Sequence, residues 1–155
     1  MELKRVVVTG IGAVSPLGNS AAETWQKLLD GVSGAAPITH FDATEFKTQF
    51  ACELKGFKAE DFIDRKEARK MDPYCHYALA AASMAMDDSA IDLESIDKNR
   101  VGVVFGVGIG GMKTFEDEIT NYALHKDTLG PKFNPFFIPK MIADICAGQI
   151  SIKYG

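Results

Sequence analysis

An alanine-rich segment at 73–88 places the strongest constraint on how this chain can fold. It follows Asp72-Pro73, where Asp is a favourable N-cap and Pro fits the first position of a helix. The next residues read YCHYALAAASMAM and are small or apolar on nearly every side of a helix. Such a helix is buried on most faces, and its small side chains let neighbouring backbones come close. The sequence therefore predicts a long buried helix that ends near 87–90.

Two short β-branched runs predict buried strands, and each leads into a glycine-rich turn. The first is KRVVVT at 4–9, and the second is VGVVF at 101–105. Between them, residues 20–23 match a capping box that opens a helix. Weaker patterns predict a short strand at 50–54 and an apolar helix at 140–150. Strands that alternate with helices favour an α/β fold with a parallel sheet.

Composition and charge exclude several classes of protein. Of the 155 residues, 46% are hydrophobic and 25% are charged, and the net charge is −4. These proportions are typical of a globular domain. A general nucleic-acid binder would need a basic surface to neutralise phosphates. No segment approaches the roughly 20 apolar residues that span a bilayer, and the first residues lack the apolar run of a signal peptide. We therefore expect a cytoplasmic protein.

The three cysteines, Cys52, Cys75 and Cys146, are far apart and form no CxxC pair. They are interpreted as reduced thiols and not as a disulfide framework. Cys146 lies in an apolar helical run and is expected to be a buried structural thiol. Cys75 and His76 are adjacent, so a helix would point them about 100° apart and they would not act as nucleophile and base. No spacing fits a metal-ligand set, and neither a metal nor a cofactor is expected.

The segment GVGIGG at 106–111 fits the G-x-G-x-x-G pattern, which in dinucleotide-binding domains presents backbone amides to a pyrophosphate. The acidic residues at 116–118 would repel phosphate, and Pro131 stands where a ribose-binding acid is expected. Gly10-Ile11-Gly12 follows the other predicted strand but lacks the third glycine. An NAD(P)-binding oxidoreductase domain remains an alternative. The simpler interpretation is that these glycines permit tight turns and close backbone packing.

A basic cluster stands out on this acidic chain. Lys66, Arg69 and Lys70 are spaced i, i+3 and i+4, so a helix would place them on one face. A local positive patch on a negatively charged protein predicts a docking site for an acidic partner.

Four segments carry a resemblance to a known family: VVVTGIGAVSPLGN at 6–19, RKEARKMDPY at 65–74, VGVVFGVGIGG at 101–111 and NPFFIPKMIADICAGQISIKYG at 134–155. In this order and spacing they resemble the 3-oxoacyl-[acyl-carrier-protein] synthase II family of bacterial fatty-acid synthesis. The resemblance covers the whole chain. It implies an α/β, thiolase-like fold, of which this chain is most of the first half, with a parallel-rich sheet beside the buried helix. Residues 1–155 would be the N-terminal part of a beta-ketoacyl synthase N-terminal domain.

The family catalyses a decarboxylative Claisen condensation. A cysteine thiolate takes an acyl group from acyl carrier protein, and two histidines assist the decarboxylation of malonyl carrier protein. The resemblance implies that this cysteine and both histidines lie beyond residue 155. No catalytic residue is therefore expected within the chain, and the chain alone is expected to be inactive. A non-catalytic subunit like the chain-length factors, which share the fold and lack the cysteine, remains a second alternative.

The resemblance also assigns binding roles to residues of this chain. The basic cluster is expected to contact acyl carrier protein. Three apolar residues are expected to line the acyl pocket, the last two by reaching across a homodimer: Ile109, Phe137 and Ile138.

Overall fold

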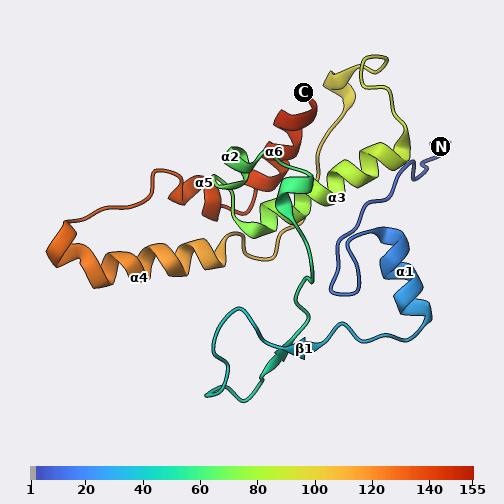
Figure 1. The fold of residues 1–155 in the computed structure, drawn as a ribbon. Helices are drawn as coiled ribbons and strands as arrows, with labels where there is room; N and C mark the ends of the chain where they lie inside the picture. The colour runs from blue at the N-terminus through green and yellow to red at the C-terminus, as the bar shows by residue number, and fades with distance from the viewer. Residues whose placement is uncertain (1–2) are drawn as a thin grey trace. The chain divides into compact units, whose positions relative to one another are not determined.

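The computed structural model describes residues 3–155 (Figure 1). These residues divide into two compact units. The first unit holds the described residues up to Lys58 together with Ala81–Ile91, and the second holds Ala59–Ala80 together with Asp92–Gly155. One helix, α3 (Pro73–Ser89), contributes residues to both units. No helix of the described chain is both long and apolar enough to cross a membrane.

The alanine-rich segment forms α3 as predicted, and it begins behind Asp72. Its first half carries the most deeply buried side chains of the helix: Cys75, Ala78, Leu79 and Ala80. In the first unit, the second half of α3 packs against the turn at Gly10 and Gly12. A Cβ atom on Gly12 would lie 1.9 Å from the carbonyl oxygen of Ala81, and one on Gly10 would lie 2.1 Å from that of Ala85. The small residues therefore serve close backbone packing, as expected.

Besides this part of α3, the first unit contains α1 (Ala21–Leu29) and a small sheet. The sheet pairs β1 (Ala36–Pro37) with β2 (Phe50–Ala51) in antiparallel register, so that Ala36 lies opposite Ala51. Ser20 is confirmed as the cap, because its side chain accepts a hydrogen bond from the backbone N–H of Glu23, whereas the Glu23 carboxylate reaches back to the N–H of Asn19 and not to that of Ser20. The local sequence was enough to predict the start of this helix, since a cap and its helix are contiguous in sequence.

The regular elements described in the second unit are all helices. It comprises η1 (Ala59–Asp61), α2 (Arg65–Ala68), the start of α3, η2 (Lys98–Arg100), α4 (Met112–Leu129), α5 (Phe137–Met141) and α6 (Ile145–Tyr154). Its buried side chains include those in the first half of α3 and Cys146 and Ile150 of α6. The single apolar helix predicted at 140–150 is divided between α5 and α6. The break occurs because the backbone at Ile142 adopts an extended conformation, with a ψ of 136°.

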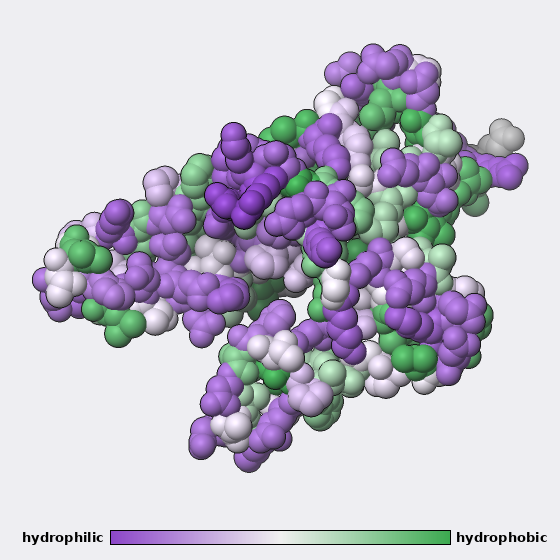
Figure 2. Space-filling view, in the orientation of Figure 1, coloured by the Kyte–Doolittle hydropathy of each residue, from purple (hydrophilic) through white to green (hydrophobic). Residues whose placement is uncertain are grey.

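The strands predicted at 4–9 and 101–105 do not form among the described residues. A strand needs a neighbour for its backbone N–H and C=O groups, and within residues 3–155 neither segment has one. Both are exposed, Val8 at 81% and Val104 at 98%. The strand predicted at 50–54 is reduced to β2, and the parallel sheet is unconfirmed. Figure 2 shows apolar residues, in green, at the surface among polar ones.

Candidate functional site

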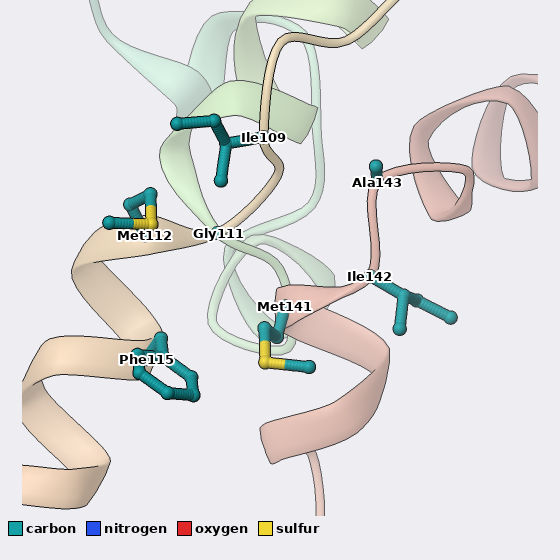
Figure 3. A pocket seen from close by; sticks show the side chains of 7 residues that line it. All are labelled: Ile109, Gly111, Met112, Phe115, Met141, Ile142 and Ala143. Carbon is teal, nitrogen blue, oxygen red and sulfur yellow. The ribbon is translucent and has the colours of Figure 1, made fainter.

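An apolar cavity of about 270 Å³ lies in the second unit (Figure 3). Two segments of the chain supply its lining. One is the glycine loop and first turn of α4, and the other is the end of α5 with the linker to α6. The lining side chains carry no charged or hydroxyl group, which suits an apolar ligand. The lining residues are Ile109, Gly111, Met112, Phe115, Met141, Ile142 and Ala143.

Two glycines bring these segments together. Gly110 has a φ of +102°, and a Cβ there would lie 2.3 Å from the carbonyl oxygen of Met141. A Cβ on Gly111 would lie 2.4 Å from the carbonyl oxygen of Lys140. The backbone N–H of Gly111 donates to the Met141 oxygen at 3.0 Å. The absence of side chains at these positions therefore lets the loop lie directly on the α5 backbone.

Of the three residues expected at an acyl pocket, the structure places one in the cavity lining. Ile109 lies at its edge, with 70% of its surface exposed. Phe137 packs its ring against Phe133 and Phe115, with centroids 5.7 and 6.2 Å away, and so supports the cavity through Phe115 without lining it. Ile138 is 54% exposed and does not line the cavity.

The sequence alone did not indicate the other lining side chains. Met112 and Phe115 follow the glycine loop at helical i, i+3 spacing, and this was the one signal that could have found them. Met141 and Ile142 come from a segment predicted as continuous helix. Met141 is the last residue of α5 and Ile142 follows it, and in Figure 3 the Ile142 side chain points away from Met112 and Phe115.

A buried carboxylate, that of Asp72, is hydrogen-bonded to the helix turn that lines the cavity. Asp72 is 5% exposed, and its Oδ2 atom accepts hydrogen bonds from Thr114 Oγ1 at 2.6 Å and Thr114 N at 3.3 Å. Its Oδ1 atom accepts from Tyr74 N at 3.3 Å, which caps α3. The hydroxyl of Tyr74 donates to the carbonyl oxygen of Ile142 at 2.5 Å. The sequence predicted Asp72 as a cap, but not its contact with α4.

Two cysteines lie fully buried near this site. Burial raises the pKa of the Cys75 thiol to about 11, and it also raises the pKa of Cys146. Both thiols are therefore protonated at neutral pH and are poor nucleophiles. The interpretation of Cys146 as a buried thiol is confirmed. His76 directs its Nε2 atom to the carbonyl oxygen of Ala68 at 2.8 Å, so its ring is engaged away from Cys75.

The basic cluster is exposed around α2. The helix is a single turn, capped by Asp64, whose side chain accepts from the backbone N–H groups of Lys66 and Glu67. Lys66, Arg69 and Lys70 are all exposed, and Lys70 also pairs with Glu67 at 2.6 Å. Arg69 follows the last helical residue in a helical conformation, with φ −64° and ψ −20°. The three cations thus lie on one short turn.

The first glycine turn shows no sign of a nucleotide site. Where a dinucleotide domain offers free amides to phosphate, the backbone N–H of Ile11 donates to the carboxylate of Asp88 at 2.8 Å. Gly10 and Gly12 are covered by α3. A carboxylate at this point would repel a pyrophosphate. In residues 3–155, no group of three or more His, Cys, Asp or Glu side chains could hold a metal ion.

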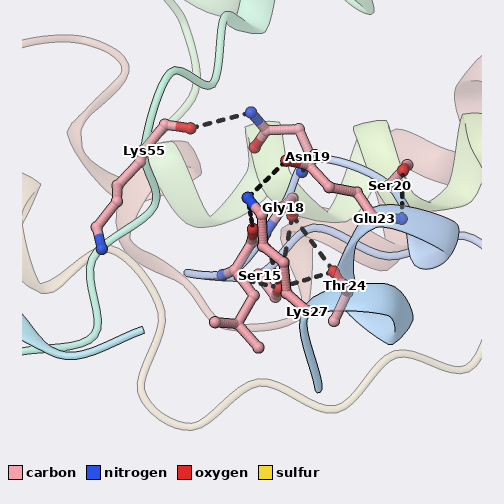
Figure 4. A network of polar contacts seen from close by, with 9 residues as sticks. Ser15, Gly18, Asn19, Ser20, Glu23, Thr24, Lys27 and Lys55 are labelled. Atoms are coloured by element: carbon pink, nitrogen blue, oxygen red, sulfur yellow. Dashed lines mark hydrogen bonds and ion pairs between the residues drawn. The ribbon is translucent and has the colours of Figure 1, made fainter. Parts of the chain in front are cut away.

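The rest of this turn is tied to α1 by a polar network (Figure 4). Ser15 and Thr24 share a hydrogen bond of 2.8 Å between their hydroxyls. Lys27 bonds both the Leu17 carbonyl oxygen, at 2.5 Å, and the Glu23 carboxylate, at 2.7 Å. The network has a structural role, since it joins the turn to the helix that follows it.

Comparison with known proteins agrees with this architecture. The model of the family described as "Beta-ketoacyl synthase, N-terminal domain" matches residues 3–155. The 3-oxoacyl-[acyl-carrier-protein] synthase 2 of Synechocystis is 44% identical over 156 residues, covering 100% of this chain and 36% of the relative. That of Coxiella burnetii is 46% identical over 155 residues, covering 99% and 36%. The chain therefore spans about a third of the length of these curated relatives.

Solved structures are similar as well. The ishigamide ketosynthase/chain length factor matches with a TM-score of 0.87 and 27% identity, covering 99% of this chain and 38% of that one. The fold is therefore of the ketosynthase, thiolase-like kind.

Proposed function

We propose, from the premise that this chain belongs to the beta-ketoacyl synthase family, that it is the N-terminal part of a condensing enzyme of fatty-acid synthesis. In this reaction a cysteine thiolate takes an acyl group from acyl carrier protein. Malonyl carrier protein then loses CO₂, and the resulting carbanion attacks the acyl thioester. We place the cysteine and the two assisting histidines in the protein beyond residue 155, so residues 1–155 contribute binding surfaces and no catalytic group.

The apolar cavity is the observation that carries this proposal. Its lining of aliphatic, thioether and aromatic side chains suits the alkyl part of an acyl thioester. Each methylene removed from water there contributes about 0.8 kcal/mol to binding. Ile109 at the edge would meet the chain as it enters. Phe137 would hold Phe115 in place, and the exposed Ile138 would reach the second subunit of a homodimer.

We propose that the basic cluster is the docking surface for acyl carrier protein. The cations of Lys66, Arg69 and Lys70 are exposed on one turn, on a chain whose net charge is −4. An acidic carrier protein would be steered to them by complementary charge. A solved type II PKS acyl-carrier protein in complex with its ketosynthase offers a parallel. It matches this chain with a TM-score of 0.78 and 28% identity, covering 99% of this chain and 41% of that one.

The unpaired segments at 4–9 and 101–105 support a further point about the fold. Their apolar residues are exposed, and they are rich in the β-branched residues that favour strands. We propose that they join the parallel-rich sheet of the thiolase-like fold when the rest of the protein supplies neighbouring strands. Residues 1–155 would then form most of the first half of that fold.

A Cys-less subunit of the chain-length-factor kind is the second candidate. The similarity to a ketosynthase/chain length factor structure supports this candidate, since both kinds of subunit share the fold. The two differ in the residue at the nucleophile position, which we place beyond residue 155. Reading the gene past that point separates them, because the enzyme requires a cysteine there.

The activity itself is tested with the whole protein, meaning a chain that includes residues 1–155 and has the length of its relatives. Incubation with acyl and malonyl carrier proteins is expected to release CO₂ and form the 3-oxoacyl product. Substitution of the downstream cysteine by Ala abolishes the product and serves as the control. The 155-residue chain alone is expected to form none. A whole protein that carries the cysteine and still yields no product would contradict the proposal.

A further inference from the structure

We infer that Asp72 and Tyr74 act as a clamp that fixes the width of the apolar cavity, and thereby the length of acyl chain that it accepts. The inference rests on the proposed function, since it assumes that the cavity takes an acyl chain. Neither residue lines the cavity, so both are positioning residues. Both come from the same short stretch at the start of α3.

The cavity has two walls that are distant in sequence. One wall is the segment 109–115, and the other is the segment 141–143. They touch directly through the hydrogen bond from Gly111 N to Met141 O, at 3.0 Å. The walls also meet where Gly110 and Gly111 lie on the α5 backbone, and the Phe115 ring packs against that of Phe137 in α5. Hydrogen bonds from the start of α3 to both walls add a polar connection to these packing contacts.

Asp72 holds the first wall. Its Oδ2 atom accepts from both the hydroxyl and the backbone N–H of Thr114, which lies between the lining residues Met112 and Phe115. Asp72 is almost fully buried, and a buried carboxylate that loses a partner incurs a large desolvation penalty. The first turn of α4 is thus kept in one position by a contact that is costly to break.

Tyr74 holds the second wall. Its hydroxyl donates to the carbonyl oxygen of Ile142, the residue at which the backbone leaves the helix after α5. Burial raises the pKa of the Tyr74 hydroxyl well above its ordinary value of 10.0, so it stays protonated and remains a donor. The backbone N–H of Tyr74 also donates to Asp72 Oδ1 at 3.3 Å. Asp72 and Tyr74 therefore connect the two walls through one turn of backbone.

The width of an apolar pocket determines how well each added methylene is accommodated. One methylene more or less in a well-formed pocket changes kcat/KM by roughly 10- to 200-fold. A clamp on both walls keeps the cavity from opening to admit a longer chain. Loosening either hydrogen bond is expected to weaken the length preference without removing a group that touches the substrate.

Conservative variants of the whole protein test the clamp. Thr114→Val removes the hydroxyl that bonds Asp72 and keeps the side-chain shape, whereas Thr114→Ser restores the hydroxyl. Tyr74→Phe removes only the hydroxyl, which bonds Ile142 and also interacts with the buried Cys75 thiol. Matched controls are Thr120→Val, an exposed position on α4, and Tyr154→Phe on α6. The readout is the ratio of kcat/KM for octanoyl and palmitoyl carrier proteins.

The Val and Phe variants are expected to shift this ratio by roughly tenfold, and the Ser variant and both controls by less than about twofold. Displacement of a fluorescent fatty-acid analogue by octanoate and palmitate gives the same comparison without catalysis. If the wild-type protein binds both acids with a length preference but does not catalyse the condensation, the proposed function is contradicted and the clamp is not. Unchanged binding ratios in Thr114→Val and Tyr74→Phe, or no fatty-acid binding by the wild type, would overturn the clamp.

Discussion

At the residue scale, the glycines near the N-terminus show how a missing side chain can determine packing. The backbone of Gly12 lies so close to α3 that a Cβ would stand 1.9 Å from Ala81 O and 2.6 Å from Ala85 N. Both atoms belong to the backbone of a helix and cannot move independently. A larger residue there would have to displace the whole turn.

Gly12→Ala is therefore expected to destabilise the fold by about 1–3 kcal/mol, through overpacking. Urea unfolding monitored by circular dichroism measures the change. Gly148→Ala is the matched control, since a Cβ at that position in α6 would meet only Ile145 Cδ1 at 4.0 Å. Replacing a helical glycine by alanine is expected to stabilise by up to about 1 kcal/mol. Equal effects of the two substitutions would contradict this account of Gly12.

The buried thiols give a prediction about reactivity. With a pKa of about 11, Cys75 is ionised in roughly one molecule in a thousand at pH 8. Cys52 is exposed, whereas Cys75 and Cys146 are buried. Iodoacetamide at pH 8 is expected to label Cys52 alone, as read by peptide mass spectrometry, and urea is expected to release the other two. Rapid labelling of Cys75 in the folded protein would show that it is not buried.

The same thiol makes stability depend on pH in the alkaline range. Burial raises the pKa of Cys75 from an ordinary value of 9.0 to about 11, so the folded state holds its proton more tightly than the unfolded state. This stabilisation is complete below about pH 9 and is lost as the pH rises towards 11. Tyr74 and Tyr77 have raised pKa values and act in the same direction above pH 10. The urea midpoint is expected to fall across this range, and less steeply in Cys75→Ala.

At the element scale, α1 depends on its cap. The Ser20 hydroxyl accepts from Glu23 N at 3.1 Å, while the Glu23 carboxylate accepts from Asn19 N at 3.0 Å. Ser20→Ala is expected to cost about 1 kcal/mol in the free energy of unfolding. Ser151→Ala, at an exposed position inside α6, is expected to change it by less than about 0.5 kcal/mol. Similar losses for both would mean that the cap contributes little.

The short helix α2 gives a second prediction at this scale, for docking. Reversing the charge of Lys66 and Arg69 to Glu is expected to weaken carrier-protein binding by roughly tenfold at low salt. The effect should shrink as salt is added, because exposed charges are screened. Surface plasmon resonance over a salt series measures both. Lys126→Glu combined with Lys132→Glu, an equal charge change at two exposed positions, is the control. Equal weakening by the control would indicate a net-charge effect instead of a docking surface.

At the scale of the whole molecule, the apolar runs at 4–9 and 101–105 are exposed, with Val6 at 88% and Val104 at 98%. If these runs become strands in the whole protein, their amides should gain hydrogen-bond partners. Amide exchange is expected to be fast there in the 155-residue chain and slower by orders of magnitude in the whole protein. The amides of α3 between Leu79 and Ala85 serve as the internal reference. Fast exchange at both runs in the whole protein would contradict the proposed sheet.

The sequence by itself determined the parts of this protein that depend on neighbours along the chain. The helix cap at Ser20 and the start of α3 behind Asp72 were predicted correctly. So was the close packing permitted by Gly10 and Gly12. Helix hydrogen bonds join residues four apart, and caps reach two or three positions, so short segments contain the information for them. The family was also evident from four local segments.

Tertiary structure alone decided the site. Asp72 and Thr114 are 42 residues apart, and Tyr74 and Ile142 are 68 apart, so no local pattern indicates that they meet. The cavity forms where a helix predicted at 140–150 breaks at Ile142 and the glycine loop settles on its backbone. The strands predicted at 4–9 and 101–105 are absent from the described residues for the same reason. A strand needs hydrogen bonds from a partner segment that is distant in sequence. Local propensity can favour an extended backbone, but only long-range contacts turn it into a sheet or a pocket wall.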